Sequence, residues 1–328
     1  MLKKKLNIFL FLISSLLTFE LFSKFYLGLG DPPLTRTHET IEYEFLPNQK
    51  VKRFRKKNLI KTNSFGMRSE NFSEDKSKLR IIIYGDSVVW GGSLIDQKDL
   101  STEILKKLLN KKSNMFEVGN VSAGSWGPGN WLAHIKDRGI YSADLVILVI
   151  SSHDWNDNPE YKPLNKRISP IKKPISASSE LINRYTIPKL LKVFDSVSKA
   201  FYTTNNIETN ISNESEDSEQ IKNKGLLDLE EFIDATKSKG AELAILQYWD
   251  KEEFESKKPK IGNKLIKNIL QNKKIIHIQT NDKFKLCSEN SELLYIDSIH
   301  PSKFGQHCLG DALYEIIKLT KTYQNLNL

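Results

Sequence analysis

The sequence contains little cysteine and, over its first third, no alanine. Two cysteines, Cys287 and Cys308, occur among 328 residues. Two are too few for a disulfide framework or for a four-cysteine metal site. An oxidising compartment would still permit one disulfide between them, but we expect no structural bridge. The first alanine is Ala123, so the N-terminal region lacks an Ala-x-Ala site for signal cleavage.

The N-terminal 30 residues instead have the charge and hydropathy of a targeting segment. Lysines at positions 3 to 5 precede an apolar run, from 6 to about 22, that Glu20 interrupts. Such a run suits either a cleaved signal or a spanning helix. Residues 28–30 form its single small-x-small sequence, so we favour an uncleaved anchor. Lysines kept on the cytoplasmic side predict a single-pass inner-membrane protein, with the chain after about residue 30 in the periplasm.

The charge gives no sign of a nucleic-acid partner. The net charge is +9, but the 49 lysines and arginines are spread along the whole chain rather than gathered in one patch. The densest basic run, residues 51–61, is typical of a solvated or membrane-facing surface. We therefore expect the inner membrane, and no nucleic acid, among the partners.

Beyond the N-terminal segment (1–30), the pattern of the chain changes at about residue 79. Residues 31–78 have little helical periodicity and predict an irregular lead-in with short strands. From 79 to 328, buried β-branched strands alternate with amphipathic helices. This alternation predicts an α/β domain whose mostly parallel sheet has helices on both faces.

An insertion at about 158–222 interrupts this alternation. It begins with four prolines and continues with an amphipathic helix, from about Ser178 to Tyr202, that Pro188 should kink or divide. A polar tract at 205–220 follows, and its low apolar content predicts a disordered loop.

The most unusual residues follow the predicted strands, at the edge of a parallel sheet where ligands collect. A serine becomes a good nucleophile when a histidine takes its proton, and that histidine needs an acceptor for its other N–H. Ser87 follows the strand at 80–84, while Asp297 and His300 lie on one turn before the last helix. Taken singly, Ser87 after a strand is compatible with a routine turn, and Asp297 with His300 before a helix is compatible with simple capping. Their common place at strand ends favours acyl transfer.

Four segments occur in the order and approximate spacing of the sequence blocks of the SGNH (GDSL) hydrolases, which this chain resembles. They are "YGDSVVWGG", "NVSAGSWGPGN", "ADLVILVISSHD" and "IDSIHPSKFGQ", and "TNSFGMRSENF" is similar to the approach found in membrane-anchored members. The resemblance covers about residues 60–320 apart from the insertion. It implies a flavodoxin-like three-layer α/β/α sandwich with a mostly parallel sheet.

The same resemblance assigns roles to residues of this chain. Ser87 is expected to be the nucleophile, His300 the base and Asp297 its orienting acid. The backbone N–H of Ser87 is expected in the oxyanion hole, and Asp86 and Asp154 in supporting places. Valine at position 89 breaks the Gly-x-Ser-x-Gly pattern, which disfavours the nucleophile-elbow hydrolases.

Two positions depart from the family pattern. The third block is normally Gly-x-Asn-Asp, and counting from Asp144 places His153 where the asparagine donates to the oxyanion. An imidazole N–H can also donate, so the protonation of His153 becomes important. In the second block, counting from Asn120 places Ser125 at the family's glycine, with Gly124 beside it. We keep both as backbone donors to the oxyanion.

The sequence gives little support for a metal or a cofactor. Asp154, Asn156 and Asn158 begin like a calcium loop, but Pro159 stands where glycine is needed and Asn165 where the closing glutamate belongs. The glycine-rich loop at 124–129 is neither a Walker loop nor a dinucleotide fingerprint. We expect no metal and no cofactor.

These features predict an anchored periplasmic enzyme that cleaves or transfers an O-acyl group through an acyl-Ser87 intermediate. An acylated small molecule or polysaccharide, or a lipid-linked cell-envelope glycan, is the expected substrate class on grounds of location alone. Two alternatives stay open. His153 at the asparagine position is also compatible with a non-catalytic envelope carbohydrate-binding protein on the same fold. A structural envelope protein could instead associate through residues 158–222.

Overall fold

The fold is described from a computed structural model. The structure describes residues 2–74, 77–159, 161, 164, 169–191, 216–289 and 292–326. The remaining parts of the insertion, including residues 192–202 of the predicted helix and 205–215 of the predicted loop, lie outside the described residues.

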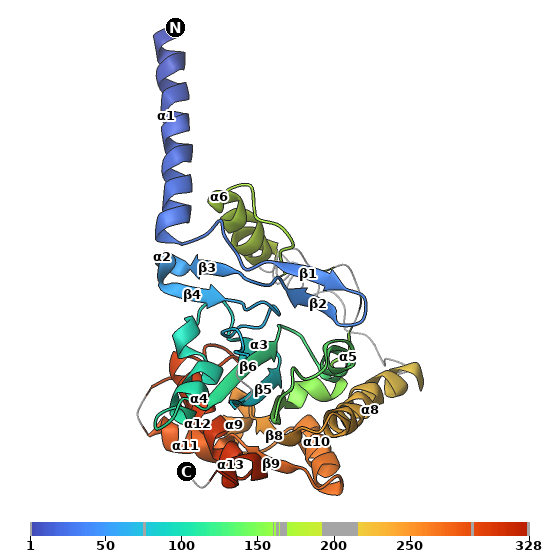
Figure 1. Ribbon diagram of the computed structural model, residues 1–328. Coiled ribbons are helices and arrows are strands. Elements are labelled where there is room, and N and C mark those ends of the chain that lie inside the picture. Colours follow the sequence, from blue (N-terminus) through green and yellow to red (C-terminus); the bar gives the residue numbers. More distant parts are fainter. Residues whose placement is uncertain are drawn as a thin grey trace.

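A five-stranded parallel sheet forms the centre of the domain (Figure 1). Its strands lie in the order β6-β5-β7-β8-β9, and every neighbouring pair is parallel. This order places the first strand between the second and the third, as in flavodoxin-like folds, where ligands bind at the carboxyl ends of the two strands that flank the reversal. The strands are β5 (Leu79–Gly85), β6 (Phe116–Ser122), β7 (Leu145–Ser151), β8 (Glu242–Tyr248) and β9 (Ile276–Gln279).

Helices cover both faces of this sheet, because alternate strand residues point to opposite sides. On one face Ile82, Val146 and Ile245 pack in one core with α5 (Pro128–Arg138), α8 (Glu216–Ser238) and α10 (Ile261–Asn272). On the other face their neighbours Ile81, Ile147 and Leu246 pack in a second core, with α4 (Ser101–Leu109), α11 (Asn281–Ser288) and α12 (Lys303–Lys318). The predicted three-layer α/β/α sandwich with a parallel sheet is therefore confirmed.

The remaining helical elements of the domain are short and connect or close these layers. They are α3 (Ser87–Trp90), η2 (Gln97–Asp99), η3 (Ser152–Asn156), α9 (Lys251–Ser256) and α13 (Lys321–Gln324).

The lead-in consists of two antiparallel hairpins that lie over the loops after β5 and β6 (Figure 1). Phe45 of the first hairpin stacks on Trp90 with ring centroids 3.7 Å apart, and Val51 and Ile60 of the second pack on the same Trp90. The elements are β1 (Thr35–His38), β2 (Glu42–Phe45), β3 (Lys50–Arg53), α2 (Phe54–Lys57) and β4 (Asn58–Lys61).

Arg68, which follows the second hairpin, is fully buried inside the loop that comes after α3. Its guanidinium donates to the backbone carbonyls of Trp90, Gly92 and Ile95, each at 2.6 Å. Burial lowers the pKa of Arg68 to about 9, so the side chain remains charged at neutral pH. One buried side chain thus satisfies three carbonyls of a loop that has little regular structure of its own.

The N-terminal helix α1 (Leu2–Leu21) continues into a π-helical turn, η1 (Phe22–Tyr26), and projects away from the domain (Figure 1). The segment Lys3–Tyr26 contains an 18-residue window with a mean hydropathy of 1.8 and is long and apolar enough to cross a membrane. A signal sequence has the same properties.

Two expectations from the sequence were wrong. Cys287 and Cys308 form a disulfide, which links α11 to α12 where the two helices pack. Residues 216–220, predicted to be loop, belong to α8, which begins at Glu216. The apolar face that Leu229 and Phe232 bury against the sheet nucleates this helix, and propagation then extends it into polar sequence.

Within the insertion, a helical segment begins at Ala177, close to the predicted start. It comprises α6 (Ala177–Glu180), a π-helical turn η4 (Leu181–Thr186) and a final helical stretch described to residue 191. The wide turn lies just before Pro188, whose ring and missing N–H disturb the hydrogen bonds of the preceding turn.

Replacing Arg68 by alanine should lower the free energy of unfolding by about 3 kcal/mol or more, because it leaves three buried carbonyls without their charged donor. Lys136→Ala is the matched control, since Lys136 forms an exposed ion pair with Glu231 that is worth about 1 kcal/mol or less. Urea unfolding of both variants measures the difference. Equal stability of the two variants would refute the role given to Arg68.

Candidate active site

Ser87 lies at the carboxyl end of β5, as the first residue of α3. The turn is tight: a Cβ on Gly85 would lie 2.3 Å from Cγ2 of Val89, so only glycine fits there. The Asp86 carboxylate caps the helix by accepting the backbone N–H of Val88 at 2.8 Å. The local sequence therefore holds Ser87 at the edge of the sheet.

The turn before α12 brings Asp297 and His300 to this serine. Nε2 of His300 lies 3.0 Å from Oγ of Ser87, and Nδ1 of the same ring lies 2.8 Å from Oδ2 of Asp297. The turn is fixed from outside, since the hydroxyl of Tyr248 donates to the carbonyl of Ile299 at 2.6 Å. The hydrogen bonds thus run in one series from Ser87 through His300 to Asp297. Ser87 and His300 are 213 residues apart in the chain.

Asp297 is ionised in this arrangement. Burial acts to raise its pKa, but hydrogen bonds from the backbone N–H groups of His300 and Ile299, together with the His300 side chain, lower the pKa below its ordinary value. The two backbone bonds are 2.8 and 2.9 Å long. A carboxylate held in this way fixes the His300 tautomer that leaves Nε2 free to accept a proton from Ser87.

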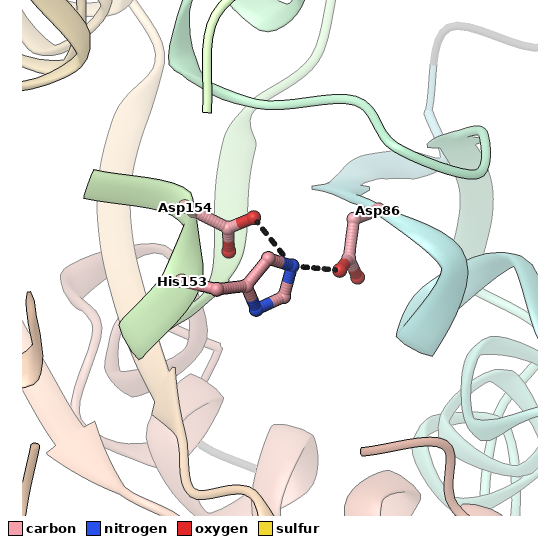
Figure 2. A group of neighbouring side chains, drawn as sticks. All are labelled: Asp86, His153 and Asp154. Atoms are coloured by element: carbon pink, nitrogen blue, oxygen red, sulfur yellow. Dashed lines mark ion pairs between the residues drawn. The ribbon is translucent and has the colours of Figure 1, made fainter. Parts of the chain in front are cut away.

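His153 lies at the carboxyl end of β7, the strand next to β5, in the short helix η3. Figure 2 shows its ring between the carboxylates of Asp86 and Asp154. Nε2 is 3.4 Å from Oδ2 of Asp86 and 3.3 Å from Oδ1 of Asp154, while Nδ1 is 2.8 Å from the hydroxyl of Ser151. Both ring nitrogens are thus engaged with neighbouring side chains.

This cluster contains two buried carboxylates and one histidine whose side chain is 44% exposed. The negative charge of Asp154, opposed by partial burial and assisted by Asp86, raises the pKa of His153 to about 10. Burial raises the pKa of Asp154, although the charge of His153 acts to lower it. We conclude that His153 is an imidazolium at neutral pH, because the carboxylates it contacts are out of reach of water.

The same three side chains present atoms of the kind that bind divalent cations, all within 4.8 Å of one another. The proton on His153 and a cation are alternative ways to neutralise the two carboxylates. With the proton in place, Nε2 is a donor and is not available as a ligand.

Gly124 and Ser125 lie in the loop between β6 and α5. Ser125 has a φ of 60°, the left-handed conformation that glycine adopts without strain. The carbonyl of Gly124 accepts a hydrogen bond from the hydroxyl of Tyr43 in the lead-in. The contacts described for this loop run to the lead-in, and they do not join it to Ser87 or His300.

Three residues that organise the site were missed by sequence reasoning: Tyr43, Tyr248 and Gln306. Tyr43 and Tyr248 act through their hydroxyls, as described above. Gln306 is fully buried and bridges two elements, donating to the carbonyl of Val88 at 2.8 Å and accepting from the N–H of Ser101 at 2.9 Å. The sequence gives a weak indication of Tyr248, because this residue ends a predicted strand at the same carboxyl edge of the sheet as Ser87. It gives no indication of the other two.

No family model matches this chain, and no curated protein matches it. Solved structures with a similar arrangement include a lipolytic protein of the G-D-S-L family from Veillonella parvula (10% identity, TM-score 0.40, 74% of this chain and 100% of that one). A catalytic mutant of an acetylxylan esterase from Geobacillus stearothermophilus is another (13%, 0.43, 75% and 96%). A third is an esterase from Pseudoalteromonas sp. (14%, 0.43, 73% and 97%).

Replacing Asp154 by asparagine should bring the pKa of His153 down from about 10 toward 6.5, because the largest cause of the shift is removed. A raised pKa in the folded state means that His153 contributes stability fully below about pH 6.5 and loses it as the pH rises toward 10. NMR titration of the histidine rings measures the shift. Asp99→Asn, beside His307, is the control and should leave His153 unchanged. An unaltered titration of His153 in Asp154→Asn would contradict the ion pair.

Proposed function

We propose that this chain is a serine-dependent ester hydrolase or O-acyltransferase that works through an acyl-Ser87 intermediate. The observation that carries the proposal is the 3.0 Å approach of His300 Nε2 to Ser87 Oγ, with Asp297 2.8 Å from the other ring nitrogen. Nucleophile, base and orienting acid are within the distances that such catalysis requires.

The chemistry runs in two steps. In the first, Ser87 Oγ attacks the ester carbonyl carbon, His300 Nε2 takes the hydroxyl proton, and the tetrahedral intermediate expels the alcohol, which leaves with that proton. In the second, an acceptor hydroxyl gives its proton to His300 and attacks the acyl-Ser87 carbonyl, and the tetrahedral intermediate expels Ser87 Oγ, which takes that proton back from His300. Water as the acceptor gives hydrolysis, whereas a sugar hydroxyl gives acyl transfer.

The oxyanion formed in both steps needs donors that are fixed in advance. The backbone N–H of Ser87 at the start of α3, and the backbone of the loop at Gly124 and Ser125, are the proposed donors. His153 adds a positive charge at the next strand end. Since its N–H groups already face Asp86, Asp154 and Ser151, we propose that it acts mainly through charge.

For location, we propose that α1 is retained as a single-pass inner-membrane anchor and that the domain lies in the periplasm. The apolar helix and the disulfide between α11 and α12 both support an oxidising compartment outside the cytoplasm. An enzyme held there suits an acylated small molecule, a cell-envelope glycan or a lipid-linked glycan as substrate.

The second candidate function is non-catalytic binding of an envelope carbohydrate on the same fold. The engagement of both His153 nitrogens by neighbouring side chains favours it, because a ring so occupied gives no directed donor to an oxyanion. This candidate predicts that Ser87→Ala and His300→Ala leave the function intact.

An activated phosphonate probe should label the wild-type protein and not Ser87→Ala. Hydrolysis of a small acetyl ester should fall by about 1000-fold or more, because the nucleophile is lost. Ser93→Ala, which removes a serine in the loop after α3, is the matched control and should label like wild type. Equal labelling of the Ser87→Ala variant would end the enzyme hypothesis.

His153→Ala should lower kcat by about 100- to 1000-fold if the residue stabilises the oxyanion. His153→Asn, which offers an amide donor but no positive charge, should show a similar loss, because the residue is proposed to act mainly through charge. Stopped-flow measurement of acylation and steady-state kcat for the same acetyl ester compares the two variants. Unchanged kcat in both variants would assign His153 to structure alone.

A further inference from the structure

The anchor helix is attached to the insertion by a specific contact. The carboxylate of Glu20 in α1 accepts the backbone N–H groups of Ala177 and Ser178, both at 2.9 Å, and the hydroxyl of Ser178 at 2.6 Å. These donors form the first turn of α6, so Glu20 caps that helix from another part of the chain. The contact also explains an acidic residue within an otherwise apolar run.

A second contact holds α6 to the lead-in. Glu180 and Arg53 form a buried ion pair, with Nη1 of Arg53 3.1 Å from Oε2 of Glu180. The same oxygen accepts the backbone N–H of Gly30 at 2.6 Å, where the chain leaves the anchor. Figure 1 shows α6 standing beside the end of α1, above the two hairpins. Its place relative to the anchor is therefore fixed at two points.

The Glu20 contact sets the depth of this segment relative to a membrane. A span that begins at Leu6 and crosses about 30 Å at 1.5 Å per residue ends near Phe25. Tyr26 follows Glu20 by six residues, so the start of α6 lies up to about 9 Å on the membrane side of Tyr26. Because the hydrocarbon span ends near Phe25, that depth lies among the acyl chains next to the headgroups.

The segment 171–191 has the composition of a surface made for that depth. Its exposed apolar side chains are Ile171, Ile175, Ile182, Leu190 and Leu191, and Ile175 is fully exposed. A groove of ≈ 340 Å³ lies between Pro32, the stretch from Pro170 to Ile175, and polar side chains of the helical segment at 179–184. Lysines 172, 173 and 189 are also exposed on this segment. Apolar side chains beside lysines are typical of segments that lie in the interface of an anionic bilayer.

We propose that residues 171–191 form a second membrane contact, in which Ile171 and Ile175 enter the lipid interface beside α1. The occupant of this surface is the bilayer itself: acyl chains against the isoleucines and the groove, and anionic headgroups against the lysines. The inference rests on the retention of α1 proposed above and does not depend on Ser87.

The test places a nitroxide label at single introduced cysteines in the full chain, reconstituted in vesicles of phosphatidylethanolamine and phosphatidylglycerol. The native cysteines are paired, so they leave the label to the new site. Ile175→Cys reports the proposed contact and Phe11→Cys the anchor. Leu319→Cys is an exposed apolar site between α12 and α13, and Figure 1 shows α13 at the end of the domain away from α1. The ratio of collisions with oxygen to collisions with a water-soluble nickel chelate measures depth.

We expect this ratio to be several-fold higher at position 175 than at position 319, and highest at position 11. Glu20→Ala should lower the ratio at 175 and leave it unchanged at 11, because the cap that sets the depth of α6 is lost. Lipid contact at 11 with a water-like ratio at 175 would overturn the inference. Water-like ratios at both positions would overturn the anchoring itself, whereas phosphonate labelling of Ser87 in the same vesicles reports separately on catalysis.

Discussion

The loop after α3, the helix that begins with Ser87, depends on a buried arginine that belongs to a different part of the chain. The loop after α3 leads from Trp90 to Ile95 without regular structure, and Arg68 supplies the donors that its carbonyls need. A buried charge is costly unless it is fully hydrogen-bonded, so this loop and this side chain stabilise each other. The lead-in is thereby a structural part of the site, because Arg68 supplies three of the hydrogen bonds that fix the loop after α3.

A second constraint acts at the neighbouring strand end. Asp86 caps the helix that begins with Ser87, and Asp154 accepts the backbone N–H of Ser151 at 2.7 Å, so each carboxylate has a local structural role. Together they put two carboxyl groups in a buried place, and an imidazolium at His153 offsets part of their negative charge. A neutral amide at position 153 would leave this charge uncompensated. The histidine is therefore matched to its carboxylates, whatever it also contributes to the chemistry.

The sheet and the approach of Ser87 to His300 could be anticipated because they depend on short-range patterns. Runs such as Leu145–Ile150 can only be buried strands, and parallel strands bring their carboxyl ends to one edge. The disulfide and the start of α8 could not, since they depend on which helices pack together. Tyr43 was equally hidden, because nothing in a short hairpin indicates that its hydroxyl will hold Gly124. The sequence identified His153 as the unusual position, but its partners depend on the turn geometry of η3.

The lead-in connects the loop after α3 to the N-terminal helix α1 by a series of short polar contacts. Toward α1, Arg53 at the end of β3 pairs with Glu180 of α6, and Glu20 of α1 caps α6. On the other side, the N–H of Leu59 in β4 donates to Asp96 at 2.9 Å, in the loop that Arg68 also holds. Each link is between elements of fixed conformation, so the domain is joined to α1 through packed structure rather than through a free linker. Ser87 is consequently held at a set distance from α1 by packed structure.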